Sequence, residues 1–183
     1  MRNTPTRFGW LAIAMHWIDA IVIVALFSIG FYMVDLTYYD ALYKPLPEIH
    51  KSLGMLMLFW FPLRFLWRLS NPKPAPVEGI SPAEQSMARL AHLAMYLLIA
   101  VVLISGYLIP TAAGAGISVF DLFTVPATIS GIANQEDVAG VIHRYVAYAL
   151  IGLVVLHASA ALKHHFINHD NTLRRMLGMS DKP

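Results

Sequence analysis

The side chains best suited to chemistry are four histidines inside long apolar segments: His16, His50, His143 and His157. An imidazole in hydrocarbon costs free energy unless something binds it, so each of them indicates a functional site. His143 and His157 are 14 residues apart, which places both on one helix face, roughly 21 Å apart along the axis. Counting from the segment ends puts His16 level with His157, and His50 level with His143. Two facing imidazole pairs at two depths are what bis-histidine ligation of two haems requires.

The apolar segments that must position these histidines are long enough to cross a bilayer as helices. They cover about 8–34, 50–69, 84–109 and 138–166. We therefore expect an all-α fold, a four-helix transmembrane bundle with haems bound between the helices, and a single integral-membrane di-haem cytochrome b domain over 1–183. Ser81, Pro82 and Glu84 form a typical helix start. Residues 117–123 are predicted to form a short helix along the interface or over the bundle mouth.

Composition supports a membrane protein and excludes several other classes. Of 183 residues, 57% are hydrophobic and 13% charged, against roughly 25% charged in an ordinary soluble domain. The absence of cysteine excludes disulfides, iron–sulfur clusters and covalent haem attachment, so a haem would be held by coordination alone. There is no basic aromatic surface suited to nucleic acid.

Basic residues are distributed unequally between the two sides of the predicted bundle. One side carries Arg2, Arg7, Arg64, Arg68, Lys73, Arg89, Lys163, Arg174, Arg175 and Lys182, and the other carries Lys44, Lys51 and Arg144. The positive-inside rule therefore predicts that both termini are cytoplasmic. The opposite loops are acidic, with Asp35, Asp40, Glu48, Asp121, Glu136 and Asp137.

The cytoplasmic end carries the residues that could contact the haem propionates and those that could bind a quinone. Arg64 and Arg68 are candidates for pairing with haem propionates. His92 and His164 could hydrogen-bond quinone carbonyls and deliver protons, and Trp17 could form an apolar wall for the ring. The alternative is a solvated basic face, which we favour for His165, His169, Arg174 and Arg175.

Two further features bear on the haem hypothesis. Small residues, among them Gly54, Gly106 and Gly140, offer space for a flat macrocycle, although ordinary helix packing also explains them. Asp19, one turn from His16, could orient that imidazole, transfer protons or lie in a wet crevice. A proton relay through unliganded histidines stays open, whereas a di-metal carboxylate site is disfavoured because no matching Glu-x-x-His pattern occurs.

These motifs occur together, in the same order, in one family. They are His16-Trp17, His50, Arg64-Phe65-Leu66-Trp67-Arg68 before a proline-rich loop, Ala91-His92-Leu93-Ala94-Met95-Tyr96, Leu156-His157-Ala158-Ser159-Ala160-Ala161-Leu162-Lys163-His164-His165 and Asp170-Asn171-Thr172-Leu173. Over nearly its whole length the chain resembles the bacterial cytochrome b561 family, whose members are four-helix di-haem membrane cytochromes. Within that family it is similar to the superoxide oxidase branch.

The resemblance implies an oxidoreductase of the bacterial inner membrane that takes an electron from periplasmic superoxide, or another one-electron donor, and reduces ubiquinone of the quinone pool. It implies two haem b groups, with His16 and His157 on the cytoplasmic haem and His50 and His143 on the periplasmic one. His92 and His164 fall near the quinone, and no catalytic residue is assigned.

Two alternatives to this enzyme remain open. One is a non-catalytic, quinol-linked electron carrier or membrane anchor subunit for a partner enzyme. The acidic outer loops are a departure that weakens the superoxide assignment, because an anionic substrate is better drawn by positive charge. The other is a channel or transporter without haem.

Overall fold

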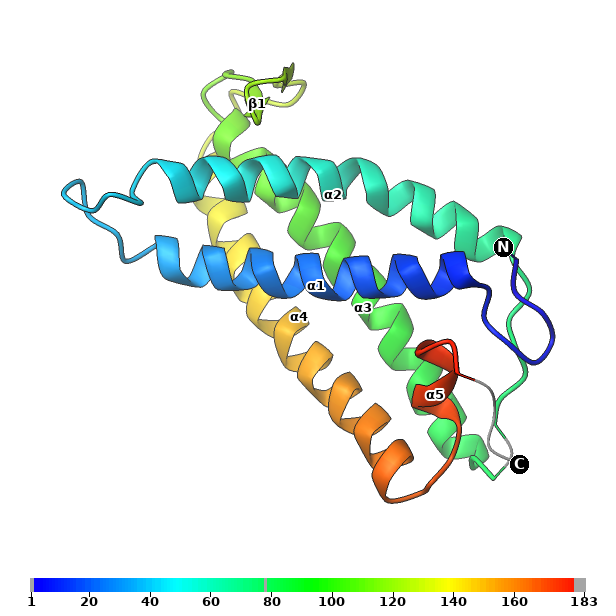
Figure 1. The fold of residues 1–183 in the computed structure, drawn as a ribbon. Helices are drawn as coiled ribbons and strands as arrows, with labels where there is room; N and C mark the ends of the chain where they lie inside the picture. The colour runs from blue at the N-terminus through cyan, green and yellow to red at the C-terminus, as the bar shows by residue number, and fades with distance from the viewer. Residues whose placement is uncertain (1, 78, 180–183) are drawn as a thin grey trace.

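Four long helices make up most of the chain in a computed structural model that describes residues 2–77 and 79–179. They are α1 (Trp10–Met33), α2 (Pro45–Ser70), α3 (Pro82–Thr111) and α4 (Gln135–Phe166), and a short α5 (Thr172–Met176) follows. α1 and α2 lie side by side and antiparallel, as do α3 and α4, and the second pair crosses the first at an angle (Figure 1). The predicted all-helical fold with four long helices is confirmed. Lys182, counted among the basic residues above, lies outside the described residues.

Within the described chain, α1, α3 and α4 are each long and apolar enough to cross a membrane. α2 has 26 residues, but Glu48 and Lys51 lie near its start and Arg64 and Arg68 near its end. Its apolar stretch is therefore the shortest of the four. The charges at its two ends suit positions near the two faces of a bilayer.

The predicted start of α3 is confirmed at the level of single hydrogen bonds. The Ser81 hydroxyl accepts from the Glu84 backbone N–H at 3.2 Å, and the Glu84 carboxylate accepts from the Ser81 N–H at 3.1 Å. Pro82 occupies the first turn, where its missing N–H costs nothing. This capping box defines where α3 begins, and so fixes the height of His92 on it.

The segment between α3 and α4 differs from the prediction of a short helix, which is wrong. It forms two antiparallel strands, β1 (Ile117–Val119) and β2 (Phe123–Val125). Three residues separate the strands, and the first two, Phe120 and Asp121, have φ of 49° and 57°, a left-handed pair typical of a tight hairpin turn. Burial alternates with period two, because Ile117 and Val119 are buried while the side chain between them is less so.

The hairpin packs over one end of the bundle, against α2 and α3. Ile117 and Val119 join Met55 and Tyr107 in a buried apolar cluster. The Tyr107 hydroxyl donates to the Pro126 carbonyl at 2.8 Å, which ties the loop after β2 to α3. We call this end, which also carries the α1–α2 loop, the outer end, and the end that carries both chain termini the inner end.

Candidate functional site

The outer imidazole pair joins α2 to α4. The ring centres of His50 and His143 are 6.0 Å apart, and their planes meet at 80°. His50 lies in the first turns of α2 and His143 in the third turn of α4, so two distant parts of the sequence bring them together. Both rings are largely enclosed by the bundle.

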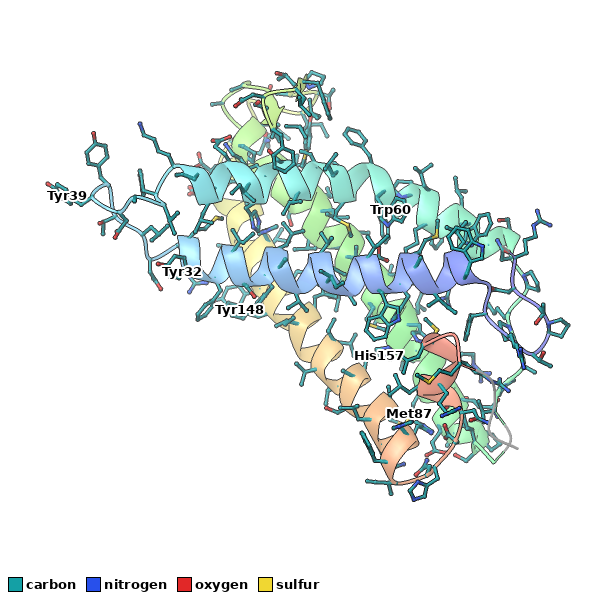
Figure 2. The ribbon with its side chains drawn as sticks, in the orientation of Figure 1. Tyr32, Tyr39, Trp60, Met87, Tyr148 and His157 are labelled. Carbon is teal, nitrogen blue, oxygen red and sulfur yellow. The ribbon has the colours of Figure 1, made fainter. Side chains whose placement is uncertain are left out.

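The inner pair joins α1 to α4. His16 and His157 have ring centres 6.3 Å apart and planes at 66°. Figure 2 labels His157 on α4, at the side of the helix that faces α1 and α3. His92 of α3 is closer still to His157, with ring centres 5.3 Å apart. The structure therefore places three imidazoles at the inner level and two at the outer level.

The hydrogen bond of His143 determines which ring nitrogen carries the proton. Nδ1 lies 2.9 Å from the backbone carbonyl oxygen of Val102 on α3. A carbonyl can only accept, so Nδ1 carries the proton and donates it. The neutral imidazole then keeps its lone pair on Nε2, the atom that a metal binds.

Asp19 forms a buried ion pair with an arginine of the neighbouring helix. Its carboxylate is 2.5 Å from Nε of Arg64 on α2, and it accepts a hydrogen bond from Nε1 of Trp60 at 2.8 Å. Figure 2 labels Trp60 on α2, where it is directed toward α1. Asp19 is only 8% exposed. Sequence reasoning placed Asp19 near His16 but missed both partners, since they lie on another helix.

The remaining arginine candidate, Arg68, lies over the ring of Tyr96 at 5.0 Å from its centre. This cation–π contact holds the guanidinium between α2 and α3 at the inner end. Trp17 donates from Nε1 to the Met176 carbonyl at 2.8 Å, so one edge of its ring is held by α5 while 36% of the residue stays exposed.

His164, at the end of α4, pairs with a carboxylate outside the helix. Its Nδ1 donates to Asp170 at 2.5 Å, and the Thr172 N–H donates to the other Asp170 oxygen at 2.8 Å. His92 and His164, the two quinone candidates, therefore have different surroundings: an imidazole beside the first and a carboxylate beside the second.

The pKa of Asp170 is held below its usual value. Burial raises this pKa, but the hydrogen bonds from Thr172 and His164 outweigh burial. A depressed folded pKa contributes stability that is present above the unfolded value of about 3.9 and is lost as pH falls through the folded value. The tie between α4 and α5 is therefore intact at neutral pH and weakens only in strong acid.

We expect Asp170→Asn to loosen α5 at pH 7. The variant removes a charged acceptor shared by two donors, a loss that corresponds to about tenfold faster local opening or more. Hydrogen exchange of the amides in Thr172–Met176 measures this. In the unchanged protein the protection factor of these amides, which is corrected for the pH dependence of intrinsic exchange, should fall only as pH drops below about 4. Equal protection in both proteins at pH 7 would show that the Asp170 contacts are not what holds α5.

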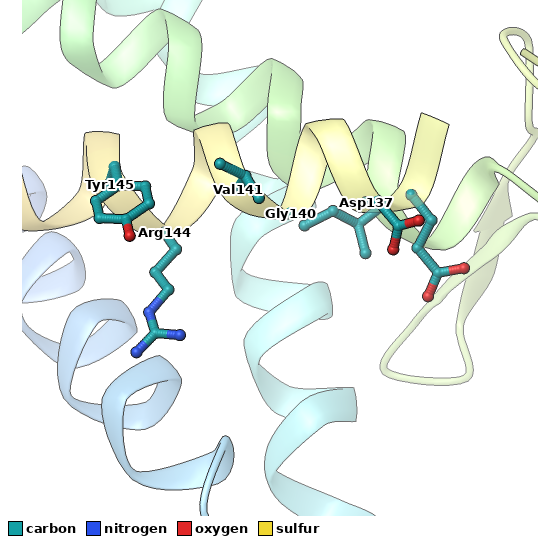
Figure 3. A pocket seen from close by; sticks show the side chains of 7 residues that line it. Asp137, Gly140, Val141, Arg144 and Tyr145 are labelled. Carbon is teal, nitrogen blue, oxygen red and sulfur yellow. The ribbon is translucent and has the colours of Figure 1, made fainter. Parts of the chain in front are cut away.

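A separate hollow of about 420 Å³ opens along the outer part of α4. Glu136, Asp137, Arg144 and Tyr145 contribute to its lining, with Gly140 between them. Figure 3 shows Asp137 and Arg144 at opposite ends of this stretch. The hollow contains no imidazole, so the paired histidines remain the candidate site.

Comparison with known proteins decides the family. The sequence model described as prokaryotic cytochrome b561 matches residues 7–179. The chain belongs to the prokaryotic cytochrome b561 family. Escherichia coli cytochrome b561 homolog 2 is 48% identical to this cytochrome b561 over 178 residues, which cover 97% of this chain and 95% of that protein.

Two more distant relatives also align along nearly their whole lengths. A Yersinia pestis protein named probable superoxide oxidase CybB is 29% identical over 93% of this cytochrome b561 and 96% of its own length. Escherichia coli cytochrome b561 homolog 1 is 29% identical over 93% of this chain and 97% of its own.

Membership confirms the predicted family and fold class. Cytochromes b561 of this family are four-helix transmembrane haem bundles, so α2 completes the bundle that α1, α3 and α4 begin. This protein is accordingly a multi-pass membrane electron carrier with b-type haem.

The distances between the ring centres of the two imidazole pairs in this cytochrome b561 fit haem ligation. A metal held about 2.0–2.1 Å from one nitrogen of each of two facing rings puts the ring centres about 6.3 Å apart. The observed 6.3 and 6.0 Å agree with this value. The 5.3 Å between His92 and His157 is too short, which separates His92 from the two pairs.

The surroundings of the pairs fit a macrocycle as well. A Cβ built on Gly54, Gly140 or Gly152 meets no atom within 4 Å, so α2 and α4 have open space beside their backbones at these positions. Gly106 differs from the sequence expectation, because the ring of His143 fills the space beside it. In the described chain, no three side chains among His, Asp and Glu gather as a metal cluster, and a haem needs none because the porphyrin supplies four nitrogens.

Proposed function

We propose that this cytochrome b561 transfers single electrons across the membrane between an outer donor, superoxide, and ubiquinone at the inner end. His50 with His143, and His16 with His157, would hold two haem b groups. When bound, these groups supply one-electron redox chemistry at two depths of the bilayer. The observation that carries the proposal is the pair of imidazole separations, 6.0 and 6.3 Å, at two levels of one bundle.

The arginines at the inner end support the inner group of this proposal. Arg64 engages Asp19 through Nε, which leaves its two terminal amino groups for a propionate. Arg68 is directed by Tyr96 toward the same end of the bundle. Both guanidiniums would pair with the propionates of the inner haem and hold it in place.

The quinone site of the proposal lies among His92, His164 and Trp17. His164 donates from Nδ1 to Asp170, so its Nε2 is the atom that faces a quinone carbonyl. Asp170 holds the ring in place by this contact, and a proton carried on Nε2 can pass to the quinone. Trp17, held by Met176, offers its exposed ring face as an apolar wall.

The orientation of the proposal places both termini in the cytoplasm of a bacterium, because the basic residues gather at the inner end. The outer surface then carries six acidic and three basic side chains. One of the three, Lys51, is paired with Glu48 at 2.7 Å. This surface repels an anionic donor, and so it favours the alternative of a quinol-linked carrier or anchor subunit without its own substrate.

Two measurements on the purified holoprotein test the proposal. A reduced-minus-oxidised spectrum with haem quantitation should give two haem b per chain. A superoxide pulse should reduce them rapidly, and added ubiquinone should reoxidise them. Because the outer charge repels superoxide, we expect the reduction rate to rise about twofold or more from low to physiological ionic strength.

The carrier alternative predicts other results. Quinol would reduce the haems while a superoxide pulse would not, and a soluble redox subunit would co-purify. A colourless protein from haem-replete cells would contradict both functions and leave a channel or transporter.

A further inference from the structure

Two glycines lie directly against the outer histidine rings, each on a helix that supplies neither histidine. A Cβ on Gly106 of α3 would lie 2.9 Å from Cε1 and 3.1 Å from Nδ1 of His143. A Cβ on Gly30 of α1 would lie 3.1 Å from Cε1 and 3.5 Å from Nδ1 of His50. In both cases Nε2 is the most distant of the ring atoms in contact, at 3.9 and 4.0 Å.

A backbone carbonyl completes the contact at Gly106. Val102 precedes Gly106 by four residues, so its carbonyl lies one turn away on the same face. It accepts from Nδ1 of His143 at 2.9 Å, and the Ser105 hydroxyl also donates to it at 3.1 Å. The ring reaches this carbonyl because no side chain stands at Gly106.

At Gly30 the ring of His50 also lies against the glycine, but its contacts are longer than those of His143 at Gly106. Leu26 precedes Gly30 by four residues, as Val102 precedes Gly106. Nδ1 of His50 is buried and forms no hydrogen bond of normal geometry. The two outer imidazoles are therefore held in similar notches, one with a hydrogen bond and one without.

We propose that Gly30 and Gly106 are positioning residues that seat the two outer histidines, with the Val102 carbonyl setting the tautomer of His143. This inference rests on the proposed function, in which His50 and His143 ligate the outer haem. It assigns α1 and α3 a role in that site although they contribute no ligand to it. Each notch holds the Nδ1 edge of a ring against one helix and directs Nε2 toward the opposite ring.

The notch at Gly106 also affects the ligand's electronic character. A hydrogen bond from Nδ1–H to a carbonyl makes the imidazole a more basic ligand, which favours the oxidised metal. Displacing His143 from Val102 should therefore raise the reduction potential of the outer haem. His50 lacks this bond, so its displacement should act through geometry alone.

The test is Gly106→Ala in the full-length holoprotein, read out by haem content, redox titration and the low-temperature spectrum of the ferric haems. A new methyl group at 2.9 Å forces the ring to move, so we expect the outer haem to be lost or to titrate at a higher potential. Gly30→Ala should have a smaller effect, because the contact is longer. Alanine is the better helix former, so a weakened helix does not explain a loss.

Two controls separate a local effect from a general one. The inner haem serves as an internal standard, because His16 and His157 touch neither glycine in this arrangement and their haem should be unchanged. Ile104→Ala alters an exposed side chain on α3, 54% accessible, beside the same turn. It should leave both haems as they are.

Each outcome decides the inference. A change confined to the outer haem in Gly106→Ala supports it. An unchanged outer haem in both glycine variants overturns it, and so does an equal change in both haems. His143→Ala distinguishes the positioning role of the glycines from the ligand role of His143. If this variant loses the outer haem while the glycine variants are unaffected, the positioning role is wrong and the proposed function is supported. If His143→Ala retains both haems, the positioning role and the proposed ligand assignment are both wrong.

Discussion

Replacing His143 by alanine is expected to remove one of two haems from the purified protein, reducing its haem content by about half. His143 and His50 have ring centres 6.0 Å apart, and neither ring has another imidazole at that separation within the described contacts. Loss of one side chain therefore leaves a single nitrogen where two are needed. The inner ligand His157 lies four turns further along α4 and should keep its haem.

Haem quantitation and a redox titration measure this result. The control is His169→Asn, which changes an exposed histidine in a left-handed conformation that asparagine also adopts. The near-perpendicular planes of the two pairs, 80° and 66°, predict strongly axial low-spin ferric signals for both haems. Loss of the signal from the 80° pair alone would match the expected result, and unchanged haem content would contradict the ligand assignment.

Replacing Asp19 by alanine is expected to destabilise the bundle by about 3–5 kcal/mol, because it leaves a partly buried arginine without its counter-charge. The side chains of Arg64 and Asp19 are 18% and 11% exposed, so water compensates little. Trp60 loses its acceptor in the same variant. Thermal unfolding of the holoprotein in detergent, followed by the loss of helical circular dichroism, measures the effect. Haem release is not the readout, because Arg64 is also a candidate for pairing with a haem propionate.

The double variant Asp19→Ala with Arg64→Met is the matched control. It removes both charges, and we expect much of the lost stability to return, as commonly happens when a buried ion pair is replaced by apolar side chains. Equal stability of the single and double variants would show that the unpaired charge is not the cause. No loss in Asp19→Ala would show that the ion pair contributes nothing to stability.

The parts of this molecule that depend on position along one helix could be predicted from the sequence. His143 and His157 share a face of α4 because of helical periodicity alone, and the Ser81–Glu84 capping box follows from residue type and spacing. Counting along the apolar segments was enough to place His16 level with His157, and His50 level with His143. These inferences need no knowledge of how the helices cross.

The parts that depend on two helices meeting could not be predicted. Nothing along the chain relates Gly106 to His143, or Asp19 to Trp60, until α3 packs on α4 and α1 on α2. Gly106 consequently read as room for a macrocycle, whereas the ring of His143 occupies that place. The hairpin was missed for a related reason, because residues 117–123 are apolar enough for a helix and only their burial on Met55 reveals the period of two.

One nitrogen ligand proposed for each metal centre comes from α4, an unbroken rod of 32 residues. The vertical distance between the centres is then set by the rise of that rod, which hardly changes with temperature, lipid thickness or the length of any loop. The rate of electron tunnelling depends steeply on distance, so a rigid helix between the two centres keeps the transfer rate between them constant. An insertion or deletion between His143 and His157 would change both the distance between the two histidines and the helix face that they share, so we expect it to disrupt one of the two centres. A change in the length of a loop would not have this effect.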